Sequence, residues 1–553
     1  MPALPLPGRK AVAQPFAGSA DALALSQAAT DAAQRRQLVA VVCAAALAAQ
    51  RLAAEIAWFA PALKIAVLPD WETLPYDHFS PHQDLVSERL ATLYRMSRSD
   101  CDVVIVAATT ALYRFAPPSY LAAFTFFIEQ GETLDVDRLR SQLALAGYQH
   151  VTQVVSPGEF GIRGGLIDLF PMGSPLPYRI DLFDNQIESI RTFDVDTQRT
   201  VYPVPRVRLL PAREFPQDEA GRTRFRGRFR EVFEGDPSKS PLYKDVSNGI
   251  MPAGIEYYLP LFFDATATLG EYLPPEAVVC LHGDVPSAIR RFWEDTDARY
   301  RLLRGDRARP LLAPSELFVS EDEFHRVLKP FARIELVPDR PAASVEPAAS
   351  ADDAAGRPDE DADAAAPTGA PAQVRRSRRG HATHALPPVQ VDRRADDPLR
   401  ALKRHVTATP ERVLIAAESL GRRETMQQYF AEYGFKPAVV ADWAEFIAGD
   451  ASPALVASPL HAGFVWPEAN ISLITEAELY AGVVRRPGKR EARRSNVDAM
   501  LRDLSEVRIG DPVVHEQHGI GRYLGLTTLD LGDGPNEFLH LLYANDAKLY
   551  VPV

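Results

Sequence analysis

The sequence predicts an α/β multidomain protein. A parallel-sheet domain carries an inserted β-rich module and precedes a small α/β domain and a small β-barrel. Helical and strand-like runs alternate over residues 1–121 and 209–338, a pattern typical of a doubly wound parallel sheet. The intervening residues 122–208 consist mainly of strand-like runs. The length of 553 residues suits roughly three to five domains.

Domain boundaries follow from these changes of pattern. Residues 339–395 are rich in Ala, Pro and Asp and lack apolar periodicity, so they cannot bury enough surface to offset their ordering entropy. The expected order is a discontinuous α/β domain (1–121 and 209–338), an insert (122–208), a disordered linker (339–395), a small α/β domain (396–480), a basic linker (481–503) and a terminal β domain (504–553).

The elements of the α/β domains are predicted from their apolar patterns. Continuous apolar runs indicate strands covered on both faces. A helix is expected to begin with Ser80 as N-cap and Pro81 in its first turn, and to end near Met96. The other expected helices cover 22–35, 45–59, 287–303 and 420–433, and the expected strands cover 38–43, 64–69, 101–107, 277–282, 412–417, 454–457 and 471–474.

Short strands at close spacing predict the terminal β-barrel. They cover 512–515, 521–525, 538–543 and 548–551. The chain stops directly after the last of them, which indicates that this domain is truncated.

The segment 158–191 is the most informative part of the insert and predicts three strands joined by turns. In its middle strand, alternation places Tyr178, Ile180 and Leu182 on one face, which suits a core. The other face presents Arg179, Asp181 and Phe183. A partner surface favours an aromatic beside an arginine, because these residues dominate docking energetics. A phenylalanine covered by a neighbouring loop is the alternative interpretation.

Composition excludes several classes of protein. The net charge of −12 argues against the whole chain being a non-specific DNA binder, because phosphate neutralisation needs a basic surface. The basic run at 485–494 is interpreted as a solvated linker. The cysteines Cys43, Cys101 and Cys280 form no CxxC motif, so neither a zinc site nor a disulfide framework is indicated. No apolar run approaches 18 residues, so we expect a cytoplasmic protein without a membrane span.

No nucleotide or metal motif is present. Gly18 and Ser19 lie where an α/β domain would place a phosphate-binding loop, but Ala20 and Asp21 follow, and an aspartate there would repel phosphate. Gly488-Lys489-Arg490 has no preceding strand. His515-Glu-Gln-His518 lies between a strand and a turn, whereas HExxH needs a helix.

Several segments together resemble the N-terminal half of bacterial transcription-repair coupling factors (Mfd), in that family's order. The strongest are Trp71-Glu-Thr-Leu-Pro-Tyr76 and Tyr543-Ala-Asn-Asp-Ala-Lys-Leu-Tyr550. The others are 79–84, the insert motif with 193–199, 252–257, and 512–523.

The resemblance implies a UvrB-like module with a degenerate RecA or P-loop-like nucleotide site at Gly18 and Ser19. It implies an insert that docks on UvrA through Arg163, Arg179, Phe183 and Asp181. It also implies a Tudor-like, CarD-related domain that binds the RNA polymerase β subunit through Gly525, Leu526, Thr527, Thr528 and Leu529, where a sheet edge can add a strand. We expect a monomer.

In that family an ATP-dependent DNA translocase motor follows these domains. The motor, which binds ATP and Mg²⁺, is absent from these 553 residues. Binding of duplex DNA is therefore expected mainly through the absent motor, and no cofactor is expected in this chain.

Two alternatives stay open. One is a UvrB-type or helicase-type ATPase with a divergent site. The other is a damaged-DNA binder, for which Trp71 and Tyr76 are candidate stacking residues, although packing at a strand end is favoured.

Overall fold

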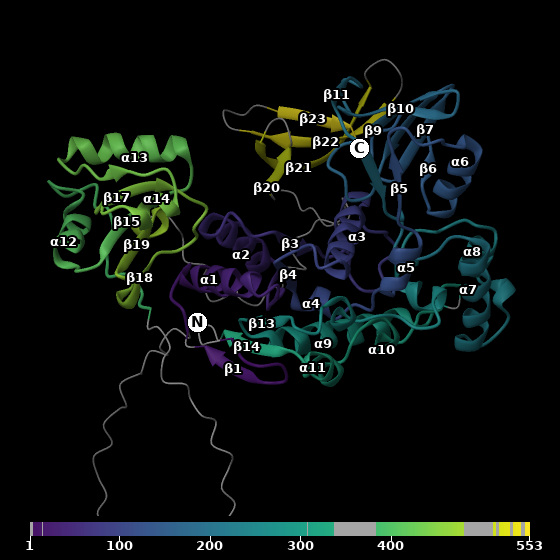
Figure 1. Ribbon diagram of the computed structural model, residues 1–553, viewed down its shortest axis with the longest axis horizontal. Helices are drawn as coiled ribbons and strands as arrows, with labels where there is room; N and C mark the ends of the chain where they lie inside the picture. Colours follow the sequence, from purple (N-terminus) through teal and green to yellow (C-terminus); the bar gives the residue numbers. More distant parts are fainter. Residues whose placement is uncertain are drawn as a thin grey trace, which may run out of the picture. The chain divides into compact units, whose positions relative to one another are not determined.

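The computed structural model describes residues 4–13, 15–306, 308–336, 383–480, 512–515, 519–530, 535–543 and 548–552. The chain divides into two compact units, Met1–Ala481 and Gly482–Val553. The first unit holds three sheets of five or six strands together with one two-stranded pair, and the second holds a single sheet (Figure 1).

A six-stranded parallel sheet in the order β1-β14-β13-β2-β4-β3 organises the first domain. Its central strands are buried on both faces, as their continuous apolar runs predict. The strands are β1 (Lys10–Ala13), β2 (Val39–Cys43), β3 (Ile65–Leu68), β4 (Val103–Ala107), β13 (Val278–His282) and β14 (Ala332–Leu336). The main helices are α1 (Ala20–Gln34), α2 (Ala46–Phe59), α3 (Gln83–Ser97), α7 (Glu219–Val232) and α9 (Val285–Leu303). Shorter helices are α4 (Ala108–Ala111), α5 (Pro118–Ala123), α8 (Pro241–Ser247), α10 (Pro314–Leu317) and α11 (Glu321–Leu328).

Helices cover both faces of this sheet, so the predicted doubly wound arrangement is confirmed. Helices α1 and α2 pack on the face that carries Val41 and Ile105. Helices α3 and α9 pack on the opposite face, against Ala40 and Val42. Strand β1 was not expected from the sequence, because an edge strand of four residues with mixed burial carries little periodic signal.

The prediction for the start of α3 was wrong. Its N-cap is His82 rather than Ser80. The Ser80 hydroxyl instead donates to Glu256 (2.7 Å) and accepts from the Gly254 amide (3.1 Å). The Ser80 side chain therefore forms a tertiary contact, although local sequence rules assign it to a helix cap.

The aromatic residues Trp71 and Tyr76 are buried, with 3% and 2% of their surface exposed. The Trp71 indole donates to Glu214 (3.0 Å), and the Tyr76 hydroxyl donates to the Leu312 carbonyl (3.0 Å). Packing is thus their role in this structure, which leaves neither ring open for stacking on a base.

The insert leaves and rejoins the first domain through an antiparallel pair, β5 (Phe126–Glu129) with β12 (Arg206–Leu209). Between them lies a six-stranded sheet in the order β11-β10-β9-β8-β7-β6 (Figure 1). Its elements are α6 (Val136–Leu145), β6 (Gln149–His150), β7 (Glu159–Arg163), β8 (Leu166–Phe170), β9 (Tyr178–Phe183), β10 (Gln186–Phe193) and β11 (Thr200–Pro203). One face, with Ile167, Ile180 and Ile190, joins the main core.

The small α/β domain has a five-stranded sheet in the order β16-β17-β15-β19-β18, in which only the β18–β19 pair is antiparallel. Its elements are α12 (Arg400–Ala408), β15 (Arg412–Ala417), α13 (Leu420–Glu432), β16 (Ala438–Val439), α14 (Trp443–Ala448), β17 (Ala454–Ala457), β18 (Phe464–Trp466), β19 (Ile471–Thr475) and α15 (Glu476–Leu479).

The structure differs from the sequence-based boundary of this domain. Residues 383–395 belong to it rather than to a linker, since His384 bridges Val465 and Val389 is buried in its core. Most of the expected linker and the whole basic run lie outside the described residues.

The second unit forms a four-stranded antiparallel sheet in the order β20-β21-β22-β23. The strands are β20 (Pro512–His515), β21 (Gly519–Asp530), β22 (Pro535–Leu542) and β23 (Lys548–Pro552). Its β content is as predicted, while closure into a Tudor-like barrel stays a prediction. His518 of the HxxH pattern lies outside the described residues.

Candidate functional site

Phe183 lies at the end of β9, directly before the turn to β10. Asp184 and Asn185 form that turn with positive φ angles of 47° and 67°, which matches the twist of a two-residue hairpin. Phe183 is 70% exposed. The neighbouring-loop alternative is therefore not what the structure shows, because no loop covers this ring in the described part of the chain.

Arg163 lies at a second hairpin tip, between β7 and β8. The register pairs Arg163 with Leu166, and Leu166 with Asp181 of β9, so Arg163 and Phe183 lie at the same end of the sheet. The turn residue Gly165 has no room for a side chain, since a Cβ there would lie 2.9 Å from the Leu182 carbonyl oxygen. The two tips are thus held close together.

Arg179 lies on the same face as Phe183 but is mostly covered, with 17% of its side chain exposed. Its guanidinium donates to Asp168 (2.7 and 3.0 Å) and to the Gln198 carbonyl (3.1 Å), and it lies 4.9 Å over the Phe193 ring. The hydrogen bonds to Asp168 raise the pKa of Arg179, so this arginine stays charged.

Asp168 is the residue of this site that the sequence reasoning missed. It lies in β8 directly opposite Arg179, has 2% of its surface exposed, and also accepts from Arg163 (2.9 Å). A lone carboxylate in the apolar run Leu166-Ile-Asp-Leu-Phe170 is the signal that was available, because a buried charge needs a partner.

The face therefore has two parts. At one end, Arg179 and Asp168 lie beside the small cluster of Val154, Phe170 and Phe193. At the other end, the Phe183 ring is exposed at its hairpin tip. Arg163, at the other hairpin tip, is also exposed, but its guanidinium reaches back to Asp168. Asp181 lies between the two ends, half-buried, and accepts from the Ser189 hydroxyl (2.7 Å). This arrangement offers an exposed aromatic ring and, at the same end of the sheet, an exposed arginine, which suits protein docking.

The predicted polymerase-binding segment Gly525–Leu529 forms part of β21. On one side it pairs with β22, from Gly525 opposite His540 to Leu529 opposite Asn536. On its other side, β20 pairs only with Gly519–Arg522, so among the described residues no strand pairs with that edge from Gly525 onward. The backbone groups of this segment are thus placed for strand addition.

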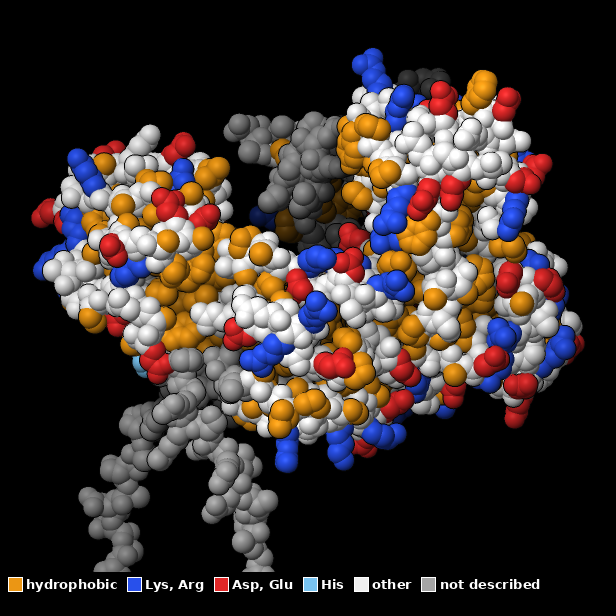
Figure 2. All heavy atoms as spheres, in the orientation of Figure 1, with side chains coloured by type: hydrophobic (Ala, Val, Ile, Leu, Met, Phe, Trp, Pro, Cys, Tyr) orange, Lys and Arg blue, Asp and Glu red, His pale blue; other side chains and the backbone are white. Residues whose placement is uncertain are grey.

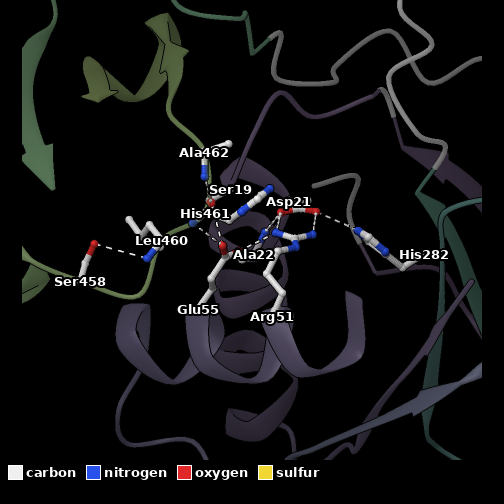
Figure 3. A network of polar contacts seen from close by, with 10 residues as sticks. All are labelled: Ser19, Asp21, Ala22, Arg51, Glu55, His282, Ser458, Leu460, His461 and Ala462. Carbon is white, nitrogen blue, oxygen red and sulfur yellow. Dashed lines mark hydrogen bonds and ion pairs between the residues drawn. The ribbon is translucent and has the colours of Figure 1, made fainter. Parts of the chain in front are cut away.

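Gly18 and Ser19 directly precede α1, as the sequence predicts. The Ser19 side chain is fully buried beneath residues 460–463 of the small domain (Figure 3). Beside it lies a charged network in which Arg51 bridges Asp21 (2.5 Å) and Glu55 (2.6 Å), and Asp21 contacts His282 (2.8 Å).

We expect Asp21→Asn to lower stability at neutral pH. Burial alone would raise the pKa of Asp21, but its hydrogen bonds to His282 and Arg51 outweigh burial and lower the pKa from 3.8 to about 2. This carboxylate therefore stabilises the fold above pH 4 by about 2 kcal/mol, and the contribution is lost as pH falls from about 4 to 2. Denaturant melts of both proteins at pH 7 and pH 3 test this, and a pH-independent difference would contradict it.

Among the described residues, no group of three or more His, Cys, Asp or Glu side chains is placed to hold a metal ion. Within the same ranges, no helix is both long enough and apolar enough to cross a bilayer.

Three protein-family models match the chain. They are the UvrB interaction domain at residues 126–215, the MFD D3 domain at 405–479, and the CarD-like/TRCF RID domain at 507–553. The insert, the small α/β domain and the terminal sheet thus each correspond to a separate match. These matches define a multidomain chain of the class that joins a UvrB-like module to a CarD-like module.

Curated relatives identify the family. The chain is 39% identical over 506 residues to the transcription-repair-coupling factor of Escherichia coli (strain K12), covering 91% of this chain and 41% of that protein. It is 37% identical to the factor of Haemophilus influenzae (97% and 44%) and 25% identical to that of Bacillus subtilis (85% and 38%). The chain belongs to the transcription-repair-coupling factor family, and it spans about two fifths of the length of these relatives.

Proposed function

We propose that this chain acts in transcription-coupled nucleotide excision repair as an adaptor that links stalled RNA polymerase to UvrA. The observation that carries this proposal is the exposed Phe183 at a hairpin tip, at the same end of the sheet as the exposed Arg163 and within the segment that matches the UvrB interaction domain. Exposing a large aromatic ring costs solubility, and a docking partner that covers the ring explains its position.

The polymerase half of the proposal rests on β21. Among the described residues, its edge from Gly525 to Leu529 has no pairing strand on the side of β20, and this edge lies in the segment that matches the CarD-like/TRCF RID domain. A strand of the polymerase β subunit would complete its backbone hydrogen bonds. Both partners are cytoplasmic in bacteria, so the proposed location is the cytoplasm. ATP hydrolysis and DNA translocation are not proposed for these residues.

A direct DNA-binding role is less well supported. Figure 2 shows basic and acidic side chains interspersed over the visible face, rather than gathered into a basic groove. Nucleic-acid binding would need such a groove together with exposed stacking rings, and Trp71 and Tyr76 are buried.

Titration of the whole chain against purified UvrA tests the adaptor function. We expect binding, and we expect Phe183→Ala to weaken it by about 2 kcal/mol or more, roughly thirtyfold, as for a docking hot spot. Phe127→Ala is the matched control, because Phe127 is an exposed ring of the same insert on a different sheet.

The same proteins test bridging. Immobilised RNA polymerase is expected to retain the chain and, through it, UvrA. With Phe183→Ala the polymerase should keep the chain and lose UvrA. Failure of the folded wild-type chain to bind UvrA would overturn the proposal, as would equal losses for the Phe183 and Phe127 variants.

A further inference from the structure

A loop of the small domain occupies the place where α/β domains bind phosphate groups. In such folds an anion lies at the N-terminus of the helix that follows the first strand, where backbone amides and the helix dipole attract negative charge. Here that helix is α1, and residues 460–463, between β17 and β18, lie against its first turn (Figure 3).

The loop makes paired hydrogen bonds with Ser19. The Ser19 amide donates to the Ala462 carbonyl (2.9 Å), and the Ala462 amide donates to the Ser19 hydroxyl oxygen (3.2 Å). The Ser19 hydroxyl in turn donates to Glu55 (2.8 Å), and the His461 amide donates to the same carboxylate oxygen (2.8 Å). The Ala462 carbonyl oxygen thus accepts the hydrogen bond that the Ser19 amide, at the helix N-terminus, would otherwise donate to a phosphate oxygen.

The approach of the two backbones leaves no space for another group. Gly18 has a φ of +51°, and a Cβ there would overlap the Gly463 carbonyl oxygen and lie 2.7 Å from that of Ala462. Glycine is therefore needed here for two reasons, the left-handed conformation and the closeness of the loop.

The charges around the loop favour a peptide over an anion. Asp21 and Glu55 both face this region, and Arg51 is already paired with both. A phosphate brings only acceptors and negative charge, which two carboxylates repel. The loop instead brings two backbone donors, the amides of His461 and Ala462, one of which satisfies Glu55 directly.

We propose that residues 460–463 are a built-in replacement for a nucleotide. The loop fills the degenerate phosphate site, excludes nucleotides from it, and uses it as the docking point that holds the small domain on the UvrB-like domain. The first turn of α1 thereby serves as an intramolecular joint. Aromatic contacts of Trp443 with Trp58 and Phe59 extend the same interface. This proposal stands independently of UvrA binding.

The test measures how tightly the two parts hold each other. A specific protease site is inserted between residues 355 and 356 of the whole chain, which is folded and then cut. The dissociation constant of the two pieces is then measured by size-exclusion chromatography over a dilution series. Two variants probe the joint, and each has a control that makes the same chemical change away from the loop.

Gly18→Ala is expected to raise this dissociation constant by about tenfold or more, because overpacking against two carbonyl groups must displace the loop. Gly8→Ala is its control, since Gly8 also has a positive φ (+74°) but nothing within 4 Å of its Cβ position. Ser19→Ala is expected to weaken the joint by about tenfold, because the Ala462 amide loses its acceptor. Ser26→Ala is the second control, since its buried hydroxyl bonds only the Leu23 carbonyl of the same helix.

The addition of Mg·ATP at millimolar concentration is expected to leave the wild-type joint unchanged. Release of the small domain by Mg·ATP would overturn the proposal, because it would show that a nucleotide competes for the site. Equal dissociation constants for each variant and its control would overturn it as well, by showing that the loop contacts contribute nothing to docking.

Discussion

Glu214→Gln is expected to destabilise the first unit by about 3–5 kcal/mol, because it leaves a buried arginine without its counter-ion. Arg89 on α3 has none of its surface exposed, and its Nε donates to Glu214 at 2.7 Å. Glu214 also accepts from the Trp71 indole (3.0 Å). The pair joins α3 to the segment that follows β12, so its loss also loosens the base of the insert.

Urea denaturation followed by circular dichroism measures this effect. Asp264→Asn is the control, because it removes one carboxylate from a solvent-exposed ion pair with Arg224, where we expect a change within about 1 kcal/mol. The double variant Arg89→Met with Glu214→Gln should recover much of the loss, since no lone charge is buried and the Gln carbonyl oxygen can still accept from the Trp71 indole. A single variant as stable as the Asp264 control would contradict this account.

Asp168→Asn is expected to lower the stability of the insert by about 2–3 kcal/mol, since hydrogen bonds to charged groups contribute this much. Asp168 accepts two bonds from Arg179 and one from Arg163. Of these arginines, only Arg179 is mostly covered, so most of the effect comes from the Arg179 pair, and the exposed Arg163 pair contributes little.

The same variant is expected to weaken UvrA binding, because an arginine released from Asp168 no longer supports the face that carries Phe183. Asp137→Asn is the matched control. It changes the same charge in the same insert, but Asp137 lies on α6, away from the docking face, and its exposed pair with Arg140 is long (3.8 Å). Thermal melts and the UvrA titration measure both quantities, and identical results for the two variants would refute the role assigned to Asp168.

Much of the fold could be predicted from the sequence wherever a segment is buried on both faces. The runs at 38–43 and 412–417 became β2 and β15 because continuous apolar residues leave few alternatives to a covered strand. Strands β1, β14 and β18 were not expected. Strands β1 and β18 are short edge strands whose pairing depends on distant partners, and β14 alternates buried and half-buried residues rather than forming a continuous apolar run. The cap of α3 was misplaced for a similar reason, because Ser80 bonds residues more than 170 positions away.

The candidate docking site was predictable only in part. Strand alternation placed Arg179 and Phe183 on one face, and the structure confirms that shared face. Alternation carries no information on how far a face is covered, however. Only the register of β8 against β9 shows that Asp168 lies opposite Arg179 and pairs with it, which keeps Arg179 mostly covered, whereas Phe183 is exposed.

By itself, the sequence determined the strands that are covered on both faces, the longer helices, the family, and the absence of a phosphate-binding lysine after Gly18, since these depend on the order of neighbouring residues. Only the tertiary structure decided what fills the place of the phosphate. Ser19 and Ala462 are 443 positions apart, and their contact arises from the packing of two domains. Local sequence patterns do not encode such pairings, because the free energy that selects them comes from burial shared between distant surfaces.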